Sequence, residues 1–272
     1  MKLSCVSLLI PGKSNRERIN LLSSLGFDGI EIVYFEEENS IKSDIKEINS
    51  ALKNNPIKVS ATTYIHNNLN DFSDKDKALR RKSITKTKLG MEMAAELGCN
   101  YIWVPELRPI DPLPFFPKFN LMDKDKYNLV IEQLHELADY AKKVEVSIYI
   151  EPINRYETTF FNTLSEAVQA CKDVASDYIC VMGDLFHMNI EESNISQSII
   201  NSKNYLKYMH LSDNNRWLPG YGDIDFIEIF KTLFYIKFSG YMTIECGIPA
   251  PIDKELSKAV KKINDFILEA KR

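Results

Sequence analysis

The chain has 272 residues, of which 44% are hydrophobic, and this is enough material for one large domain or two small ones. Its formal net charge is −4. A mildly acidic chain lacks the basic surface that supplies most nucleic-acid affinity, so the charge argues against a DNA or RNA partner.

Cysteine usage and hydropathy indicate the compartment. The five cysteines are odd in number and show no CxxC spacing, which favours free thiols in a reducing, cytoplasmic setting. The first apolar segment ends at Pro11-Gly12 and is too short for a signal peptide, so we interpret it as a strand. No later apolar run approaches the roughly 20 residues that span a membrane.

Apolar runs alternate with helix-like stretches along the whole chain. Strands are predicted over 3–10, 29–34, 57–64, 100–105, 144–151, 178–184, 205–211 and 240–246. Helices are predicted over 14–25, 40–54, 76–97, 124–142, 163–175, 191–201, 226–238 and 253–270. Eight such alternations predict an α/β protein, a (β/α)8 TIM barrel that forms a single domain over residues 1–272. The alternative is a doubly wound open sheet. A dinucleotide site has no support, because no G-x-G-x-x-G follows the first strand.

Four successive predicted strands in the second half end at a side chain that can bind metal. These side chains are Glu151, Asp184, His210 and Glu245. Parallel strands bring their carboxyl ends to one edge, so we expect the four groups to converge there as metal ligands. Oxygen ligands with a single imidazole suit Mn²⁺, with Mg²⁺ and Co²⁺ as alternatives, better than structural zinc. Such a site would leave positions for two adjacent substrate oxygens, as in a hydroxyketone.

The segments around these ligands resemble the ketose 3-epimerases, the D-tagatose/D-psicose 3-epimerase family of the xylose isomerase-like superfamily. The resemblance rests on Glu151-Pro-Ile-Asn-Arg-Tyr-Glu157, Gly183-Asp-Leu-Phe-His-Met-Asn189, His210-Leu-Ser-Asp-Asn-Asn-Arg216 and Thr243-Ile-Glu245. It covers the C-terminal half in register, whereas the first half matches only in its barrel pattern.

The resemblance implies a metal-dependent isomerase that epimerises a ketose at C3 through an enediolate. Glu151 and Glu245 would be the catalytic residues and would exchange protons on opposite faces of the sugar. Glu157, His187 and Arg216 would bind substrate oxygens. Ordinary structural roles compete with these three assignments: an ion pair of Glu157 with Arg155, a helix-terminal His187 and a solvated Arg216.

The first half leaves the substrate open. Ser4-Cys-Val-Ser7 lacks the aromatic residue that these epimerases place against the sugar, and Trp103-Val-Pro-Glu-Leu-Arg108 is also unusual for them. The Pro/Phe-rich loop over 109–119 is interpreted as a packed loop, a lid or a subunit contact, so a homodimer or homotetramer is compatible with the sequence.

Several other functions use the same fold. Related chemistries are those of an inosose dehydratase, a hydroxypyruvate isomerase or a sugar-phosphate epimerase. An endonuclease IV-type phosphodiesterase would require more than the four histidines present. A barrel that binds sugar without turnover would not need two opposed carboxylates.

Overall fold

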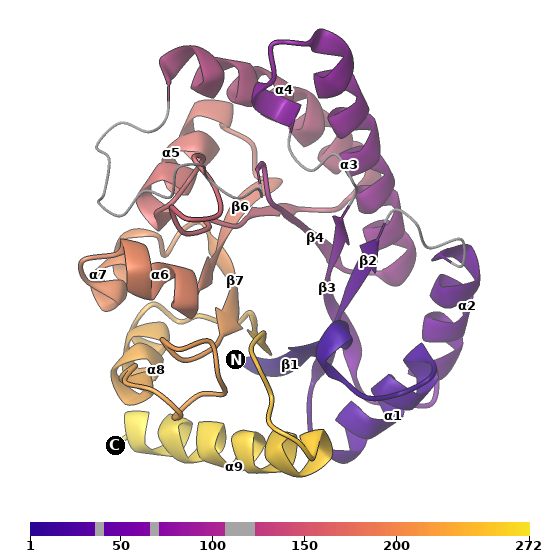
Figure 1. Ribbon diagram of the computed structural model, residues 1–272, viewed down its shortest axis with the longest axis vertical. Coiled ribbons are helices and arrows are strands. Elements are labelled where there is room, and N and C mark those ends of the chain that lie inside the picture. The colour runs from indigo at the N-terminus through magenta and orange to yellow at the C-terminus, as the bar shows by residue number, and fades with distance from the viewer. Residues whose placement is uncertain (36–40, 66–70, 107–122) are drawn as a thin grey trace.

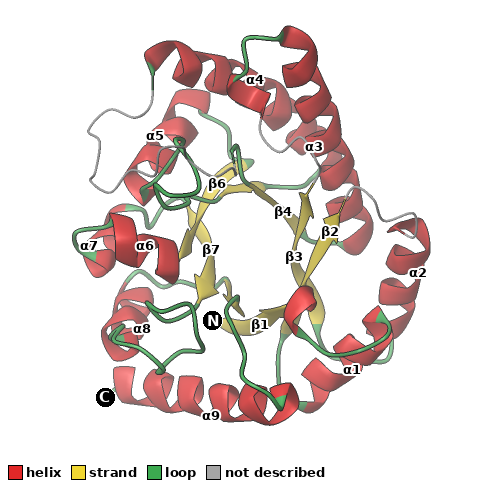
Figure 2. Cartoon of the chain, viewed as in Figure 1, coloured by secondary structure: helices red, strands yellow, loops and turns green. Residues whose placement is uncertain are grey.

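The computed structural model describes residues 1–35, 41–65, 71–106 and 123–272. Eight parallel strands close into a barrel, because β1 pairs with β8 as well as with β2. Figure 1 and Figure 2 show helices outside this ring of strands. The predicted (β/α)8 barrel is therefore confirmed, and the doubly wound open sheet is wrong because an open sheet has two free edges.

The strands lie close to their predicted positions. They are β1 (Lys2–Val6), β2 (Gly29–Phe35), β3 (Lys58–Ile65), β4 (Asn100–Trp103), β5 (Ile148–Ile150), β6 (Ile179–Asp184), β7 (Leu206–Leu211) and β8 (Tyr241–Ile244). The first strand is shorter than predicted, because a 3-10 helix, η1 (Ser7–Leu9), follows Val6 directly. A second 3-10 helix, η2 (Asp71–Ser73), precedes α3.

The helices of the described residues also follow the predicted order. They are α1 (Asn15–Ser24), α2 (Ile41–Leu52), α3 (Lys77–Leu97), α4 (Lys124–Val144), α5 (Leu164–Val174), α6 (Leu185–Glu191), α7 (Ile195–Asn201), α8 (Phe226–Tyr235) and α9 (Ile252–Ala270). None of these helices is both long and apolar enough to cross a bilayer. The fifth predicted strand loses its first residues because α4 continues to Val144 and then ends at Glu145, which has a left-handed backbone (φ 57°).

After β6 the structure contains two short helices in place of the single one predicted over 191–201. Asp184 caps the first of them, α6, by accepting a hydrogen bond from the Phe186 backbone N–H. Asn194 caps the second, α7, in the same way through the Gln197 N–H. Because α6 begins directly at the strand end, its first turn lies beside the predicted metal ligands.

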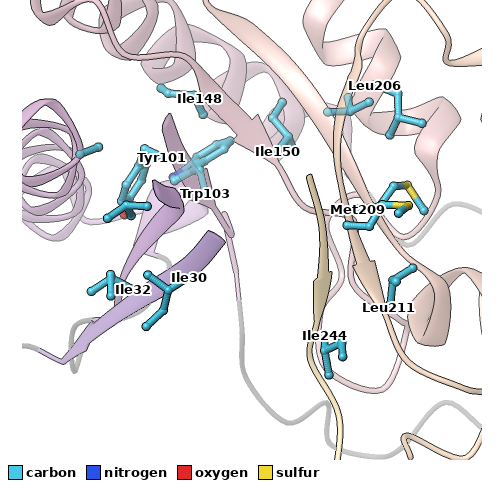
Figure 3. Packing of buried hydrophobic residues seen from close by; sticks show 14 of the residues in the cluster. Ile30, Ile32, Tyr101, Trp103, Ile148, Ile150, Leu206, Met209, Leu211 and Ile244 are labelled. Carbon is cyan, nitrogen blue, oxygen red and sulfur yellow. The ribbon is translucent and has the colours of Figure 1, made fainter. Parts of the chain in front are cut away.

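Alternation along the strands divides the core into two layers. Outward-facing residues such as Ile30, Ile32 and Ile148 pack against the helices in the larger cluster, part of which Figure 3 shows. Inward-facing residues form a second cluster that includes Ile102, Met182 and Tyr208. Full burial of each aliphatic side chain stabilises the fold by about 1.5–3 kcal/mol. The interior is nevertheless partly polar, since Ser4, Ser60, Thr243 and Glu31 are buried there.

Candidate metal centre and active site

The four predicted ligands meet at the carboxyl ends of β5 to β8. Glu151 and Glu245 each follow the last residue of a strand, and their backbone N–H groups extend the ladder to Trp103 and Leu211. Asp184 and His210 are paired across β6 and β7. One ligand atom from each of the four lies within 4.8 Å of the others. The convergence predicted from strand order is thus present in the fold.

His210 shows why a cation fits this group. Its Nδ1 lies 3.2 Å from Glu151 Oε1, 3.2 Å from Glu245 Oε2 and 3.7 Å from Asp184 Oδ2. The atom is buried and has no hydrogen-bond partner. A buried polar atom without a partner is costly, and three carboxylates this close repel one another. A divalent ion would accept the Nδ1 lone pair and would offset the repulsion between the carboxylates. Three oxygens with one nitrogen suit Mn²⁺ or Mg²⁺.

The electrostatics of the group reflect this crowding. Burial raises the pKa of Glu151, and the nearby Glu245 and Asp184 carboxylates raise it further. Although burial opposes the shift, the carboxylates of Glu245, Glu31 and Glu151 hold the pKa of His210 well above its usual value. Burial also opposes the shift at Asp184, whose pKa lies well below its usual range because of Arg216 and His187. The raised pKa values of Glu151 and His210 mean that both groups hold their protons more tightly, and these protons offset part of the negative charge that a metal ion would otherwise neutralise.

The three predicted substrate-binding residues also border the group. Arg216 bridges Asp184 and Glu245, and its guanidinium lies 4.6 Å from the centroid of the Phe186 ring. His187 is buried on α6, with Nε2 3.8 Å from Asp184 Oδ2. Glu157 is half-buried in the loop after β5 and lines the same cavity.

Asn154 connects two of these residues, a link that was not predicted from the sequence. Its side-chain amide donates to Glu157 Oε1 at 2.8 Å and lies 2.8 Å from His187 Nδ1. Its backbone N–H also donates to His187 Nδ1, at 3.3 Å. Two donors on Nδ1 make that atom an acceptor, so the proton of the neutral ring is on Nε2. His187 therefore presents an N–H donor toward the site, and the competing ion pair of Glu157 with Arg155 is not formed, since Arg155 pairs with Glu191.

The loop that carries Arg216 is organised by Asp213, a buried carboxylate. Asp213 accepts hydrogen bonds from the backbone N–H groups of Asn214, Gly220 and Ile224. Arg216 itself has φ 62°, the left-handed region that non-glycine residues seldom adopt. Its guanidinium pairs with Asp184 and Glu245, which contradicts the alternative of a solvated charge.

Glu31 is the second residue of the site that was not predicted. It is 1% exposed on β2, and its Oε2 lies 2.9 Å from His210 Nε2. The signal was a carboxylate in the apolar run Gly29–Phe35, between Ile30 and Ile32. Alternation places residue 31 on the opposite face from these two isoleucines, which is the barrel interior.

A cavity of about 170 Å³ opens over the four predicted ligands. One end is polar, with Glu151, His210, Arg216 and Glu245. The other end is largely apolar and comes from the first half of the barrel, with lining residues that include Val6, Leu8, Val33, Ile65, Phe72 and Trp103. The loop over 109–119 and His66 lie outside the described residues.

A family model described as "Xylose isomerase-like TIM barrel" matches residues 19–265, and the chain belongs to this family. The predicted superfamily is thereby confirmed.

Several relatives of this chain are named as sugar epimerases. The chain is 29% identical over 237 residues to the 3-dehydro-D-guloside 4-epimerase of Escherichia coli K12, covering 86% of this chain and 87% of the relative. It is 25% identical over 263 residues to the ketose 3-epimerase of Arthrobacter globiformis, covering 95% and 88%. Epimerases are isomerases, which agrees with the predicted enzyme class.

Solved structures share the fold. The crystal structure of E. coli 3-keto-D-glucoside 4-epimerase superposes with a TM-score of 0.85 at 23% identity, over 97% of this chain and 99% of the other. D-psicose 3-epimerase from Clostridium cellulolyticum H10, solved with D-tagatose, gives a TM-score of 0.82 at 22% identity, over 98% and 99%.

Proposed function

We propose that this protein is a divalent-metal-dependent epimerase that inverts a carbon next to the carbonyl of an unphosphorylated sugar, with C3 of a ketose as the first candidate. The observation that carries the proposal is the group of three carboxylates around the unpartnered Nδ1 of His210. Glu151, Asp184, His210 and Glu245 would hold the ion, with Mn²⁺ preferred over Mg²⁺ and Co²⁺.

The ion would polarise the substrate carbonyl and so acidify the neighbouring C–H bond. Epimerisation then requires one group to remove the proton and another to return a proton to the opposite face. Glu151 and Glu245 suit these roles because they belong to non-adjacent strands, β5 and β8, on either side of the ligands from β6 and β7. A bound sugar would lie between their carboxylates.

Three further residues are suited to hold the sugar. The His187 Nε2–H is a donor whose direction Asn154 sets through Nδ1. Glu157 offers an acceptor for a hydroxyl, and Arg216 offers several donors to an oxygen on which negative charge develops. These donors and acceptors would bind the hydroxyl groups of a sugar beside the metal ion.

The cavity lining favours an unphosphorylated substrate. Among the described lining residues, Arg216 is the only Lys or Arg, and it already bridges two carboxylates. A phosphate group would need additional cationic or backbone N–H donors at the far end. That end is instead largely apolar.

Epimerisation at C4 of a 3-keto sugar is the second candidate. The E. coli relative named for such a reaction aligns with 86% of this chain. In addition, β1 and η1 present Val6 and Leu8 to the cavity in place of an aromatic residue. Because both reactions remove a proton next to a ketone, the same four ligands and two proton carriers would serve either one.

Solvent deuterium exchange tests both candidates. The metal-free protein is loaded with Mn²⁺ and incubated in D₂O with ketohexoses, ketopentoses and a 3-keto glycoside. We expect deuterium at C3 of a ketose or at C4 of the 3-keto sugar, together with the inverted product. If none of these sugars incorporates deuterium, the proposal is overturned.

A variant pair sharpens this test. Glu245→Gln should reduce exchange by about 10²–10⁴-fold at saturating Mn²⁺, because a proton carrier is lost. Glu136→Gln alters a half-buried carboxylate on α4 that pairs with Lys88, and this control should retain full activity.

A further inference from the structure

Glu31 holds the ring nitrogen of His210 that faces away from the metal group. The Glu31 Oε2 atom lies 2.9 Å from His210 Nε2 and accepts a hydrogen bond from Tyr208 Oη at 2.9 Å. Both side chains of the Glu31–His210 pair are 2% exposed. The contact joins β2 to β7 across the inside of the barrel, over 179 residues of sequence.

A column of hydroxyl groups beneath Glu31 determines the direction of each hydrogen bond. Tyr208 donates its single proton to Glu31, so its oxygen must accept from Thr243 at 2.5 Å and from Ser60 at 2.8 Å. Ser60 has then used its own proton, so at 2.7 Å it must accept from Ser4. Every donor in the column therefore points toward Glu31, which remains an acceptor for the His210 N–H.

We propose that Glu31 is a positioning residue for the metal centre, which fixes the ring of His210 so that Nδ1 faces the three carboxylates. The inference rests on the metal site of the proposed function. With the proton held on Nε2, the Nδ1 lone pair is directed at the site, where that atom has no other hydrogen-bond partner. A carboxylate behind a metal-binding histidine also makes the ring a better ligand.

Packing alone does not account for a glutamate at this position. An ionised carboxylate inside a barrel costs several kcal/mol of desolvation, and an apolar side chain of similar size would avoid that cost. The neighbouring Ile30 and Ile32 show that the strand otherwise uses aliphatic residues. The carboxylate of Glu31 is therefore at an interior position of β2 from which it reaches His210 Nε2.

Mn²⁺ binding measured on the metal-free protein tests the proposal without reference to turnover. Free Mn²⁺ is counted by its electron paramagnetic resonance signal, and the metal-induced rise in Tm gives a second readout. Glu31→Gln keeps the shape and removes the charge. We expect its Kd for Mn²⁺ to rise about 10–100-fold. We also expect an equal or higher metal-free Tm and a smaller rise in Tm on adding Mn²⁺.

The matched control is Glu106→Gln, which alters another fully buried glutamate. Glu106 follows β4 and accepts hydrogen bonds from the backbone N–H and the hydroxyl group of Thr159. This change should leave the Kd for Mn²⁺ unaltered even if it lowers Tm. If Glu31→Gln does not fold, Tyr208→Phe removes the donor to Glu31 and should raise the Kd for Mn²⁺.

The possible outcomes distinguish failure of the proposed function from failure of the proposed role of Glu31. Wild-type protein that binds no divalent ion would overturn the proposed function and this inference together. Wild-type binding with an unchanged Kd in Glu31→Gln would overturn the role of Glu31 alone. Loss of turnover at an unchanged Kd would also overturn it, because a positioning residue acts through the metal site.

Discussion

Arg216 Nη1 lies 2.8 Å from Asp184 Oδ2, and Nη2 of the same guanidinium lies 2.5 Å from Glu245 Oε2. One cation thus neutralises part of the charge of two predicted metal ligands. The two oxygens that Arg216 contacts are also the ones nearest His210 Nδ1, so the guanidinium borders the position that an ion would take.

This bridge predicts opposite effects of Arg216→Gln on catalysis and on metal binding. Loss of the guanidinium should lower kcat/KM by about 10²–10³-fold, because donors to the developing oxyanion are lost. The Kd for Mn²⁺ should be equal to or lower than that of the wild type, because a positive charge has left the site. Isothermal titration and steady-state kinetics measure the two quantities. The exposed Arg81→Gln is the control, and a tenfold rise in the Kd of Arg216→Gln would contradict the prediction.

Asn154→Ala should affect substrate binding and turnover but not metal binding. Without the two N–H donors of the Asn154 side chain, Glu157 loses this donor and His187 Nδ1 keeps only the longer bond from the Asn154 backbone. A misplaced donor of this kind costs about 10²-fold in kcat/KM. The Kd for Mn²⁺ should not change, because Asn154 contacts none of the four ligands in the described contacts. Asn55→Ala, before β3 at the far end of the barrel, is the control. Equal kinetics for both variants would refute this role.

Metal binding should release protons, and its affinity should rise with pH. The pKa of His210 is raised above its ordinary 6.5 and that of Glu151 above 4.5, so both groups retain protons to higher pH in the metal-free protein. Binding requires both to be deprotonated, so with rising pH log Kd should fall by about one per pH unit where only His210 is protonated, and by about two where Glu151 also holds its proton. Titration in buffers of different ionisation heat counts the protons. A Kd that is constant between pH 5.5 and 8 would disprove the prediction.

The shift at Asp184 has the opposite sign. Its lowered pKa keeps it ionised in the folded state, so it stabilises the fold above about pH 3.8 and this contribution is lost as pH falls through the lower value. Asp184 therefore releases no proton when metal binds near neutral pH.

Gly90→Ala should destabilise the fold although the position is inside α3. Alanine in a helix interior is ordinarily favoured over glycine by about 0.8–1.0 kcal/mol. A Cβ here would meet Tyr101 Cε2 at 2.5 Å, and overpacking of this kind costs about 1–3 kcal/mol. Urea denaturation should therefore show a lower free energy of unfolding. In a Tyr101→Ala background the same change should become stabilising, and additive effects would contradict the steric explanation.

The order of elements made the ligand group predictable. Parallel strands place their carboxyl ends at one edge, so Glu151, Asp184, His210 and Glu245 needed only to follow successive strands. Glu31 was not predicted because its partner is 179 residues away and meets it only when the barrel closes. Asn154 was missed for a different reason. Asn154 lies in the segment Glu151–Glu157, but its role depends on α6, which places His187 beside it. The helix predicted over 191–201 does not cover His187.

The hydroxyl column below Glu31 has a consequence for engineering. Selection for thermal tolerance alone favours hydrocarbon at buried polar positions, because each replacement removes a desolvation cost. At Ser60, Tyr208 and Thr243 such selection would act on residues that do not belong to the group of four candidate ligands. If Glu31 has the proposed role, thermostable variants obtained in this way would retain an intact barrel and the same four candidate ligands, yet bind Mn²⁺ poorly. Libraries designed from the visible active site alone should therefore hold these interior hydroxyl groups constant.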